Sequence, residues 1–193
     1  MTDRERIQGI IQRDRAVFSE VVNLYQRHVI RTCYSLVHDD QDARDIAQEV
    51  FIEILDSARS FRGDAKLSSW IYRIAVNKSL NHLKQKKRRQ FLTRIGLHSA
   101  NSKEYATIEH KDTGHSSTDS ALQEIEIRKI LHTAINSLPV NQRIAFTMHK
   151  YEDLAYKEIA EVMNISVSSV ESLMHRAKLN LQKKLEQYYR NNK

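Results

Sequence analysis

The chain has 193 residues, enough for one large domain or two small ones. Lysine and arginine together number 31 against 24 aspartate and glutamate residues, and the formal charge of +7 favours contact with a polyanion, either nucleic acid or an anionic membrane. Only 4 glycines and 1 proline are present, which is too few for a strand-rich fold with many tight turns, so the composition favours an all-α fold. The single cysteine, Cys33, excludes an internal disulfide and a cysteine-rich metal site.

The N-terminal sequence, MTDRERIQ, lacks the apolar core of a signal peptide. No window approaches the roughly 18 uninterrupted apolar residues of a transmembrane helix. We therefore expect a cytoplasmic protein with no direct membrane insertion.

The N-terminal part of the chain carries three helical patterns. From Ala16 to about Val37, apolar residues recur three and four positions apart, as on the buried face of a helix. Asp39, Asp40 and Asp42 then supply carboxylates suited to the start of a second helix. A third helix is predicted from about Leu67, after a turn at Gly63-Asp64. It ends in a basic run, 84–89.

A polar stretch divides the chain. From about 91 to 120 the helical periodicity is lost and Ser, Thr, Asn, His and Gly accumulate. Some thirty irregular residues inside one compact domain would be unusual, so we predict two small helical domains, 1–92 and 121–193, joined by a flexible linker, 93–120.

The most specific local pattern is a helix-turn-helix between Tyr156 and His175. A short apolar stripe is followed by Asn164, which tolerates the left-handed backbone of a tight turn, and Ser166 is a favourable N-cap for the second helix. Such a motif places a recognition helix in the DNA major groove. On that helix the polar residues predicted to face solvent and to contact DNA are Ser168, Ser169, Glu171, Ser172, His175, Arg176 and Lys178. A merely solvated helix face is the alternative for this set.

Taken together, these motifs make the chain resemble the extracytoplasmic-function (ECF) group of bacterial sigma factors, the minimal members of the sigma-70 family. The resemblance rests on 42–51 (DARDIAQEVF), 61–77 (FRGDAKLSSWIYRIAVN), 154–160 (LAYKEIA) and 168–178 (SSVESLMHRAK), and covers nearly the whole chain outside the linker. It implies a sigma region 2 helical bundle followed by a sigma region 4 helix-turn-helix. The implied partners are core RNA polymerase, through its clamp and flap, promoter DNA and an anti-sigma factor.

The resemblance also assigns roles to residues. Asp45, Gln48 and Glu49 share one side of a helix and would dock on core polymerase, although ordinary helix solvation explains them too. The −10 element would be read and opened by aromatic stacking and by polar contacts from Trp70, Tyr72, Arg73 and Asn77, with Trp70 at least partly a packing residue. Sequence-independent attraction to the DNA backbone would come from Lys84, Lys86, Lys87 and Arg88. The solvent face of the recognition helix would read the −35 element.

Two positions depart from the family pattern. Ala155 stands where relatives often have a serine that caps the helix, so Glu158 is expected to lack its capping-box partner, at a cost of about 1 kcal/mol. Glu171 stands where a basic residue is common, and so the −35 sequence preferred by relatives does not transfer to this chain.

Two other readings compete. An ordinary helix-turn-helix regulator would bind a symmetric operator unaided, with its N-terminal half sensing a ligand or dimerising. A nuclease would use Asp39, Asp40, Asp42, Asp45 and Glu49 as metal ligands, but the start of a helix explains the first carboxylates and no nucleophile accompanies them. His28 with Cys33 lacks a second ligand pair. The expectation is therefore a transcription initiation factor and not an enzyme, with no cofactor and no metal.

Overall fold

In a computed structural model, residues 1–94 and 119–191 are described, and they are α-helical apart from turns and one short 3₁₀ segment. The predicted linker, 93–120, falls almost entirely on residues 95–118, outside the described part. No helix in the described part is long and apolar enough to cross a membrane.

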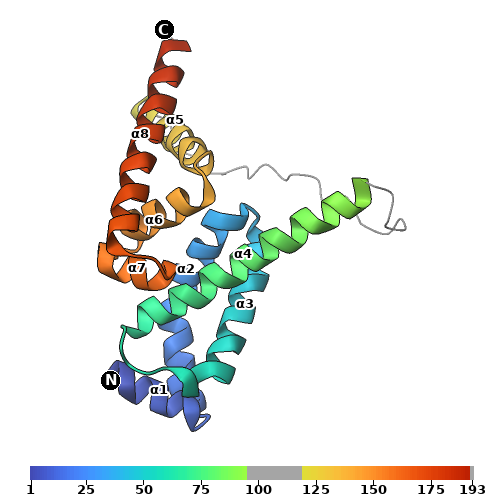
Figure 1. The fold of residues 1–193 in the computed structure, drawn as a ribbon, viewed down its shortest axis with the longest axis vertical. Helices are drawn as coiled ribbons and strands as arrows, with labels where there is room; N and C mark the ends of the chain where they lie inside the picture. Colours follow the sequence, from blue (N-terminus) through green and yellow to red (C-terminus); the bar gives the residue numbers. More distant parts are fainter. Residues whose placement is uncertain (95–118, 192–193) are drawn as a thin grey trace.

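The first module is a bundle of three long helices with a short one across its end (Figure 1). The long helices are α2 (Arg15–Val37), α3 (Asp40–Ser57) and α4 (Leu67–Arg94), and the short 3₁₀ turn η1 (Ala58–Ser60) follows α3. All three pack against one another around residues such as Val29, Ile54 and Ile71 that have 0% exposure. The predicted all-α bundle is confirmed.

Side chains at the helix starts explain where these helices begin. Asp14 accepts from the backbone N–H of Ala16 at 2.8 Å, and Asp39 accepts from the N–H of Asp42 at 2.8 Å, so each satisfies a donor that the first helical turn leaves unpaired. Gly63 adopts φ 78°, the left-handed backbone that glycine tolerates, which confirms the predicted turn before α4. The third helix was predicted to end in the basic run, but α4 continues past it to Arg94.

One helix was not predicted from the sequence. The helix α1 (Asp3–Ile11) begins with a capping box in which Thr2 and Glu5 exchange hydrogen bonds, and it buries Ile7 and Ile10 against the bundle. The Asp3 carboxylate accepts the N–H of Leu67 at 2.9 Å. The α1 helix therefore supports the start of α4, which carries the predicted −10 residues.

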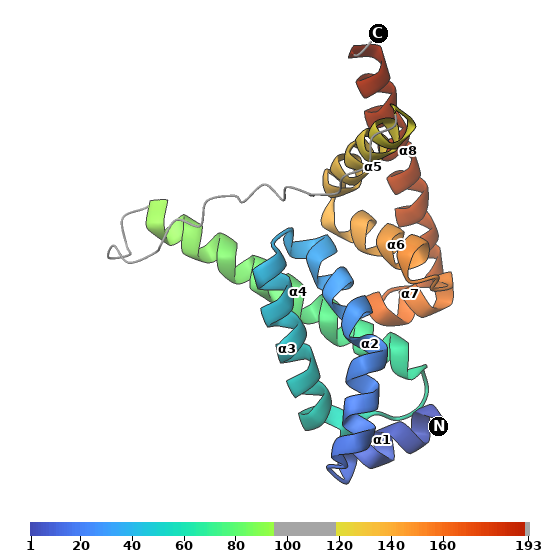
Figure 2. The same ribbon diagram turned by 180° about the vertical axis from the view of Figure 1, so that it is seen from behind.

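The second module holds α5 (Asp119–Asn136), α6 (Val140–Tyr151), α7 (Tyr156–Met163) and α8 (Val167–Asn191). Leu138 is buried just before α6. Pro139 occupies the N-cap of α6, where its lack of a backbone N–H costs no helical hydrogen bond. The two chain ends lie at opposite ends of the molecule, and α8 extends beyond the rest (Figures 1 and 2).

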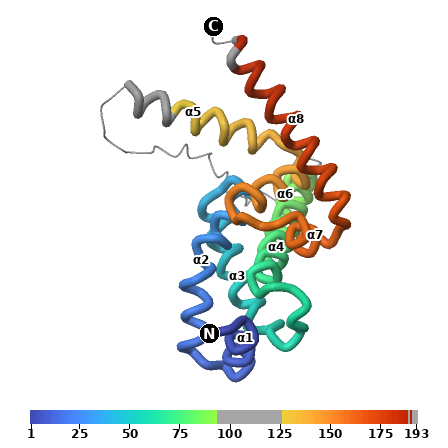
Figure 3. The backbone as a smooth tube through the Cα atoms, turned by 90° about the vertical axis from the view of Figure 1, so that its left-hand side faces the viewer, coloured from blue at the N-terminus to red at the C-terminus, as the bar shows by residue number. Residues whose placement is uncertain are grey.

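The two modules pack against each other. The α6 helix contacts α2, and α7 contacts α4, so the helix-turn-helix rests on the beginning of the predicted −10 helix (Figure 3). The sequence predicted two linked domains and gave no indication of this contact.

Candidate nucleic-acid interface

The helix-turn-helix is formed by α7 and α8 as predicted. Asn164 ends α7 with φ 53° and ψ 50°, the left-handed conformation expected of it. Ser166 accepts the N–H of Ser169 at 3.2 Å and so caps α8. Ile159 of α7 and Val170 and Ala177 of α8 each have 0% exposure, so the apolar faces of both helices are buried. Both local predictions about the turn are confirmed.

The opposite face of α8 is open to solvent. All seven residues predicted to contact the −35 element are exposed, namely Ser168, Ser169, Glu171, Ser172, His175, Arg176 and Lys178. Several are held by contacts on their own helix. Ser172 donates to the Ser168 carbonyl at 3.0 Å, and Arg176 donates to the Ser172 carbonyl at 3.2 Å. The face therefore presents hydroxyls, an imidazole, a carboxylate and cations along one surface suited to a groove.

The predicted absence of a capping side chain at Ala155 is confirmed. Ala155 has no side chain that could cap α7, but Glu158 still accepts the Ala155 N–H at 2.8 Å. It also forms an ion pair with Lys66, whose Nζ lies 2.7 Å from its Oε1. These contacts lower the pKa of Glu158, through Lys66 first and the Ala155 N–H second. Glu158 thus keeps its own half of the capping box and has a further partner in the other module.

The four residues predicted to act at the −10 element all lie on α4 but differ in how far they are exposed. Asn77 is exposed, whereas Trp70 is half-buried with its ring centroid 5.4 Å from that of Phe61, an edge contact that shows its packing role. The Nε of Arg73 is buried and has no hydrogen-bond partner among the described residues. Tyr72 is 4% exposed and donates its hydroxyl to Glu152 at 3.1 Å. In this arrangement Tyr72 cannot stack on a base.

The basic run lies on the outer part of α4. Lys84, Lys86, Lys87 and Arg88 are all exposed. Lys86 forms an ion pair with Asp42 at 3.0 Å, and His82 contacts the same Asp42 oxygen at 3.0 Å. Burial would raise the pKa of Asp42, but Lys86 and His82 outweigh it and lower the pKa overall. Part of the predicted DNA-attracting charge is therefore neutralised within the module.

The predicted polymerase-docking residues lie together on the surface of α3. Asp45, Gln48 and Glu49 are all exposed. Asp45 accepts from Gln41 at 2.9 Å, and a carboxylate oxygen of Glu49 lies 3.9 Å from the ammonium of Lys78 on α4. The three side chains offer an acidic and amide surface that a basic partner could cover.

The carboxylates considered as nuclease ligands have separate partners. Asp39 caps α3, Asp40 pairs with Arg44 at 2.7 Å, and Asp42 pairs with Lys86. Within 1–94 and 119–191, no three His, Cys, Asp or Glu side chains are placed to hold a metal ion. His28, considered with Cys33 as a ligand, contacts Glu152 instead.

Sequence comparisons identify both modules. Residues 21–89 match the family model for sigma-70 region 2, and residues 128–181 match that for sigma-70 region 4. The chain is 33% identical to the RNA polymerase sigma-H factor of Pseudomonas aeruginosa over 184 residues, covering 95% of this chain and 94% of the relative. It is 31% identical to the ECF RNA polymerase sigma-E factor of Haemophilus influenzae, with 96% of each chain covered.

Solved structures agree on the fold. CnrH in complex with the cytosolic domain of CnrY gives a TM-score of 0.65 at 17% identity, covering 96% of this chain and 97% of that one. The sigma factor RpoE in complex with the anti-sigma factor NepR from Bartonella quintana gives 0.65 at 21% identity, covering 88% and 96%. The α7–α8 motif, the region 2 bundle and these matches define a DNA-binding transcription initiation factor of the sigma-70 type. The chain belongs to the ECF group of RNA polymerase sigma factors.

Proposed function

We propose that this chain directs core RNA polymerase to promoters, with α8 reading the −35 element and α4 reading and opening the −10 element. The observation that carries the proposal is the exposed polar face of α8 on a correctly capped helix-turn-helix, within a chain that matches sigma factors over 95% of its length. Sigma factors initiate transcription by binding and do not themselves catalyse a reaction. We place the protein in the cytoplasm, where its template and polymerase are.

The residue assignments follow from exposure. Asp45, Gln48 and Glu49 would bind core polymerase, because they are exposed together on the surface of α3. Arg73 and Asn77 would bind the unpaired −10 strand, because Asn77 is exposed and Arg73, one turn before it on α4, is half-buried with a guanidinium that can donate to phosphate or base edges. The interactions with the unpaired strand would offset the cost of unstacking, which is a few kcal/mol.

An anti-sigma factor is the proposed regulator. The solved neighbour RpoE is bound to the anti-sigma factor NepR, and the shared fold gives this chain the same two-module framework on which such a protein could act. The sequence of the anti-sigma factor would determine which surface of this chain it covers.

The test compares four mixtures on genomic DNA fragments in a gel-shift assay: no protein, the chain alone, core polymerase alone, and both together. We expect specific retarded bands only with both proteins. A chain that binds specific, two-fold symmetric sites unaided would instead be an ordinary helix-turn-helix regulator. As a matched pair, Arg176→Ala should weaken the specific complex, and Arg190→Ala, at the far end of the same helix, should not.

A further inference from the structure

The far end of α4 projects beyond the helical bundle of the first module (Figures 1 and 2). Ser79 of this helix is still buried, whereas every residue from 84 to 91 is exposed. The exposed stretch contains five cations, Lys84, Lys86, Lys87, Arg88 and Arg89. No acidic residue occurs between 78 and 94, so the positive charge of this end is not balanced by any neighbour along the helix.

One aromatic side chain stands among these cations. Phe91 is 62% exposed, the largest fraction among the exposed large hydrophobic side chains of the described residues. Three of the cations share its face of the helix, because they precede it by three, four and seven residues: Arg88, Lys87 and Lys84. We refer to these four residues as the Phe91 stripe.

The Phe91 stripe points away from the rest of region 2. A helix turns by about 100° per residue, so the stripe lies on the other side of α4 from Lys86. Lys86 reaches back to the bundle, where its ammonium lies 3.0 Å from the carboxylate of Asp42 on α3. The three cations of the stripe form no ion pair with any residue of 1–94 or 119–191. The stripe therefore offers three charges and one ring to an external partner.

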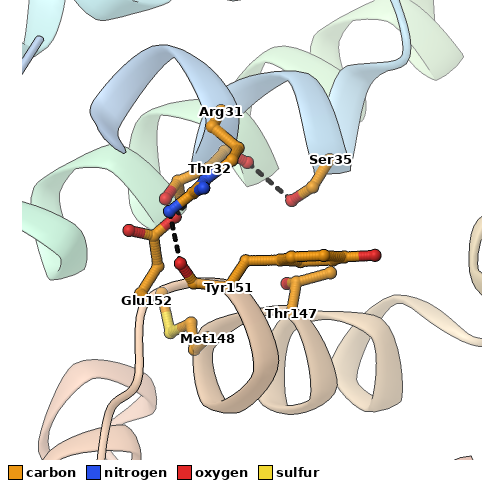
Figure 4. A pocket seen from close by; sticks show the side chains of 7 residues that line it. All are labelled: Arg31, Thr32, Ser35, Thr147, Met148, Tyr151 and Glu152. Atoms are coloured by element: carbon orange, nitrogen blue, oxygen red, sulfur yellow. Dashed lines mark hydrogen bonds and ion pairs between the residues drawn. The ribbon is translucent and has the colours of Figure 1, made fainter. Parts of the chain in front are cut away.

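Elsewhere in the molecule, a cation and an aromatic ring are matched within the fold. The guanidinium of Arg31 lies 5.9 Å from the centre of the Tyr151 ring, donates to the Tyr151 carbonyl and pairs with Glu152 at 2.8 Å (Figure 4). The hydrogen bond to Glu152 raises the pKa of Arg31, so this cation stays charged with its counter-charge beside it. The Phe91 stripe has the same chemical components without a counter-charge among the described residues.

The chemistry of the stripe favours a polyanion that also carries aromatic bases. Lys84 and Phe91 are about 10 Å apart along the helix axis, a length over which one DNA strand carries about three phosphates. An exposed ring beside cations can stack on a base while the cations bind the backbone of the same strand. In a duplex the faces of the bases are covered by their neighbours, so only an unpaired strand offers such a face.

An anionic membrane suits the stripe less well. A helix that lies in the membrane interface buries a broad apolar face together with its basic residues. From 84 to 91, Phe91 is the sole apolar residue. A single ring provides a contact for one base and too little apolar surface for a lipid layer.

We propose that the Phe91 stripe is a second binding site for single-stranded DNA, in which the Phe91 ring stacks on a base and the three cations bind the neighbouring phosphates. The ring lies about 20 Å along α4 from Asn77, the last residue assigned to the −10 element, so the stripe holds different nucleotides. That the strand comes from an opened promoter rests on the proposed function, whereas the binding of single-stranded DNA does not.

The first measurement is the affinity of the full chain for a fluorescein-labelled thymidine oligomer, followed by fluorescence anisotropy at low salt. An oligomer of about 20 nucleotides exceeds the site size of typical single-strand binding modules. Phe91→Ala should weaken binding to this strand about tenfold, the loss expected for one stacked base. Binding to a duplex of the same length should change less than about twofold, since its base faces are covered.

Matched variants separate stacking from other causes of a weaker complex. Phe91→Tyr keeps an aromatic ring and should bind the strand as wild type does, whereas Phe91→Leu keeps only an apolar side chain and should lose as much as Phe91→Ala. Ile52→Ala removes a comparably exposed apolar side chain, 58% exposed on α3, and should change neither affinity. Arg88→Gln should weaken binding to strand and duplex alike and reduce the dependence of the affinity on salt.

Three results would overturn the proposal. The first is a wild-type chain that does not bind the single strand at low salt. The second is a Phe91→Leu chain that binds the strand as tightly as Phe91→Tyr. The third is binding to phosphatidylserine vesicles by wild type and not by Phe91→Ala, which would assign the stripe to an anionic membrane instead of DNA.

The second measurement adds core polymerase and promoter DNA. Phe91→Ala should lower promoter opening several-fold and leave the affinity of the chain for core polymerase unchanged. A loss of that affinity would place Phe91 in a polymerase contact and overturn the assignment to DNA. If the wild type opens no promoter with core polymerase, the proposed function fails, and the oligomer measurement still decides whether the stripe binds a single strand.

Discussion

Gly9 allows α1 to lie against α2. The packing around it decides whether replacement by alanine raises or lowers the free energy of unfolding. A Cβ at Gly9 would lie 2.7 and 2.8 Å from the two methyl groups of Val17 and 2.9 Å from its Cβ. All three distances are too short, and the branched Val17 side chain has one preferred rotamer in a helix, so it cannot swing away.

For Gly9→Ala, the gain in helix propensity and the cost of overpacking oppose each other. In an open helix Gly→Ala would stabilise by about 1 kcal/mol, whereas overpacking a core costs about 1–3 kcal/mol. We expect Gly9→Ala to destabilise region 2 by about 1 kcal/mol net. The assay is urea denaturation followed by the fluorescence of Trp70, the single tryptophan, which lies in region 2.

The double variant Gly9→Ala/Val17→Ala supplies the control for this reasoning. Removing the Val17 methyls should relieve the clash, so the double variant should lose less stability than the two single losses added together. A Gly9→Ala chain more stable than wild type, or strict additivity of the two changes, would show that α1 does not pack on α2 as described.

Four further predictions concern the turn, pH, the thiol and DNA opening. Asn164→Ala should destabilise the helix-turn-helix by about 1 kcal/mol while Asn164→Gly should not, because only glycine adopts the left-handed backbone freely; hydrogen exchange of α7 amides measures it, and equal protection in both variants would contradict it. Partial removal from water, with Arg143 and His132 nearby, lowers the pKa of His38 to about 4. The folded state therefore binds fewer protons, so this contribution to stability is complete above pH 6.5 and is lost as the pH falls toward 4. Urea midpoints should fall less between pH 7 and 5 in His38→Asn than in wild type, and parallel curves would argue against the assignment. Burial raises the pKa of the Cys33 thiol to about 11, so the folded chain should resist alkylation at pH 8 and react fully only in denaturant, which a mass measurement checks. Arg73→Ala should reduce promoter opening, read by a fluorescent base analogue at −10, about tenfold more than it reduces core binding; an equal loss of both would remove Arg73 from the −10 site.

The sequence was informative wherever local chemistry decides the structure. Apolar periodicity predicted the long helices, and Asp39, Asn164 and Ser166 set helix ends through contacts within a few residues of themselves. The exposed face of α8 was predictable because its opposite face is apolar and buried. The α1 helix was missed because it is short and its amphipathic pattern is brief, although Thr2 and Glu5 formed a recognisable capping box.

The arrangement of the modules could not be predicted in this way. Glu152, Arg143 and Lys66 look like ordinary polar residues in the sequence, and each finds its partner in the other module, as Glu152 does with His28 across 124 positions. No local pattern indicates a contact between residues so far apart. The same contact explains why Tyr72, an aromatic residue suited to stacking, is buried here, and why Glu158 is paired although its cap residue is alanine.

We propose above that this chain gives core RNA polymerase its promoter specificity. Run-off transcription on genomic fragments tests it most directly, with core polymerase alone, the chain alone, and both together. We predict discrete transcripts, starting at defined positions, only when both are present. Transcripts that are the same with and without the chain would contradict the claim.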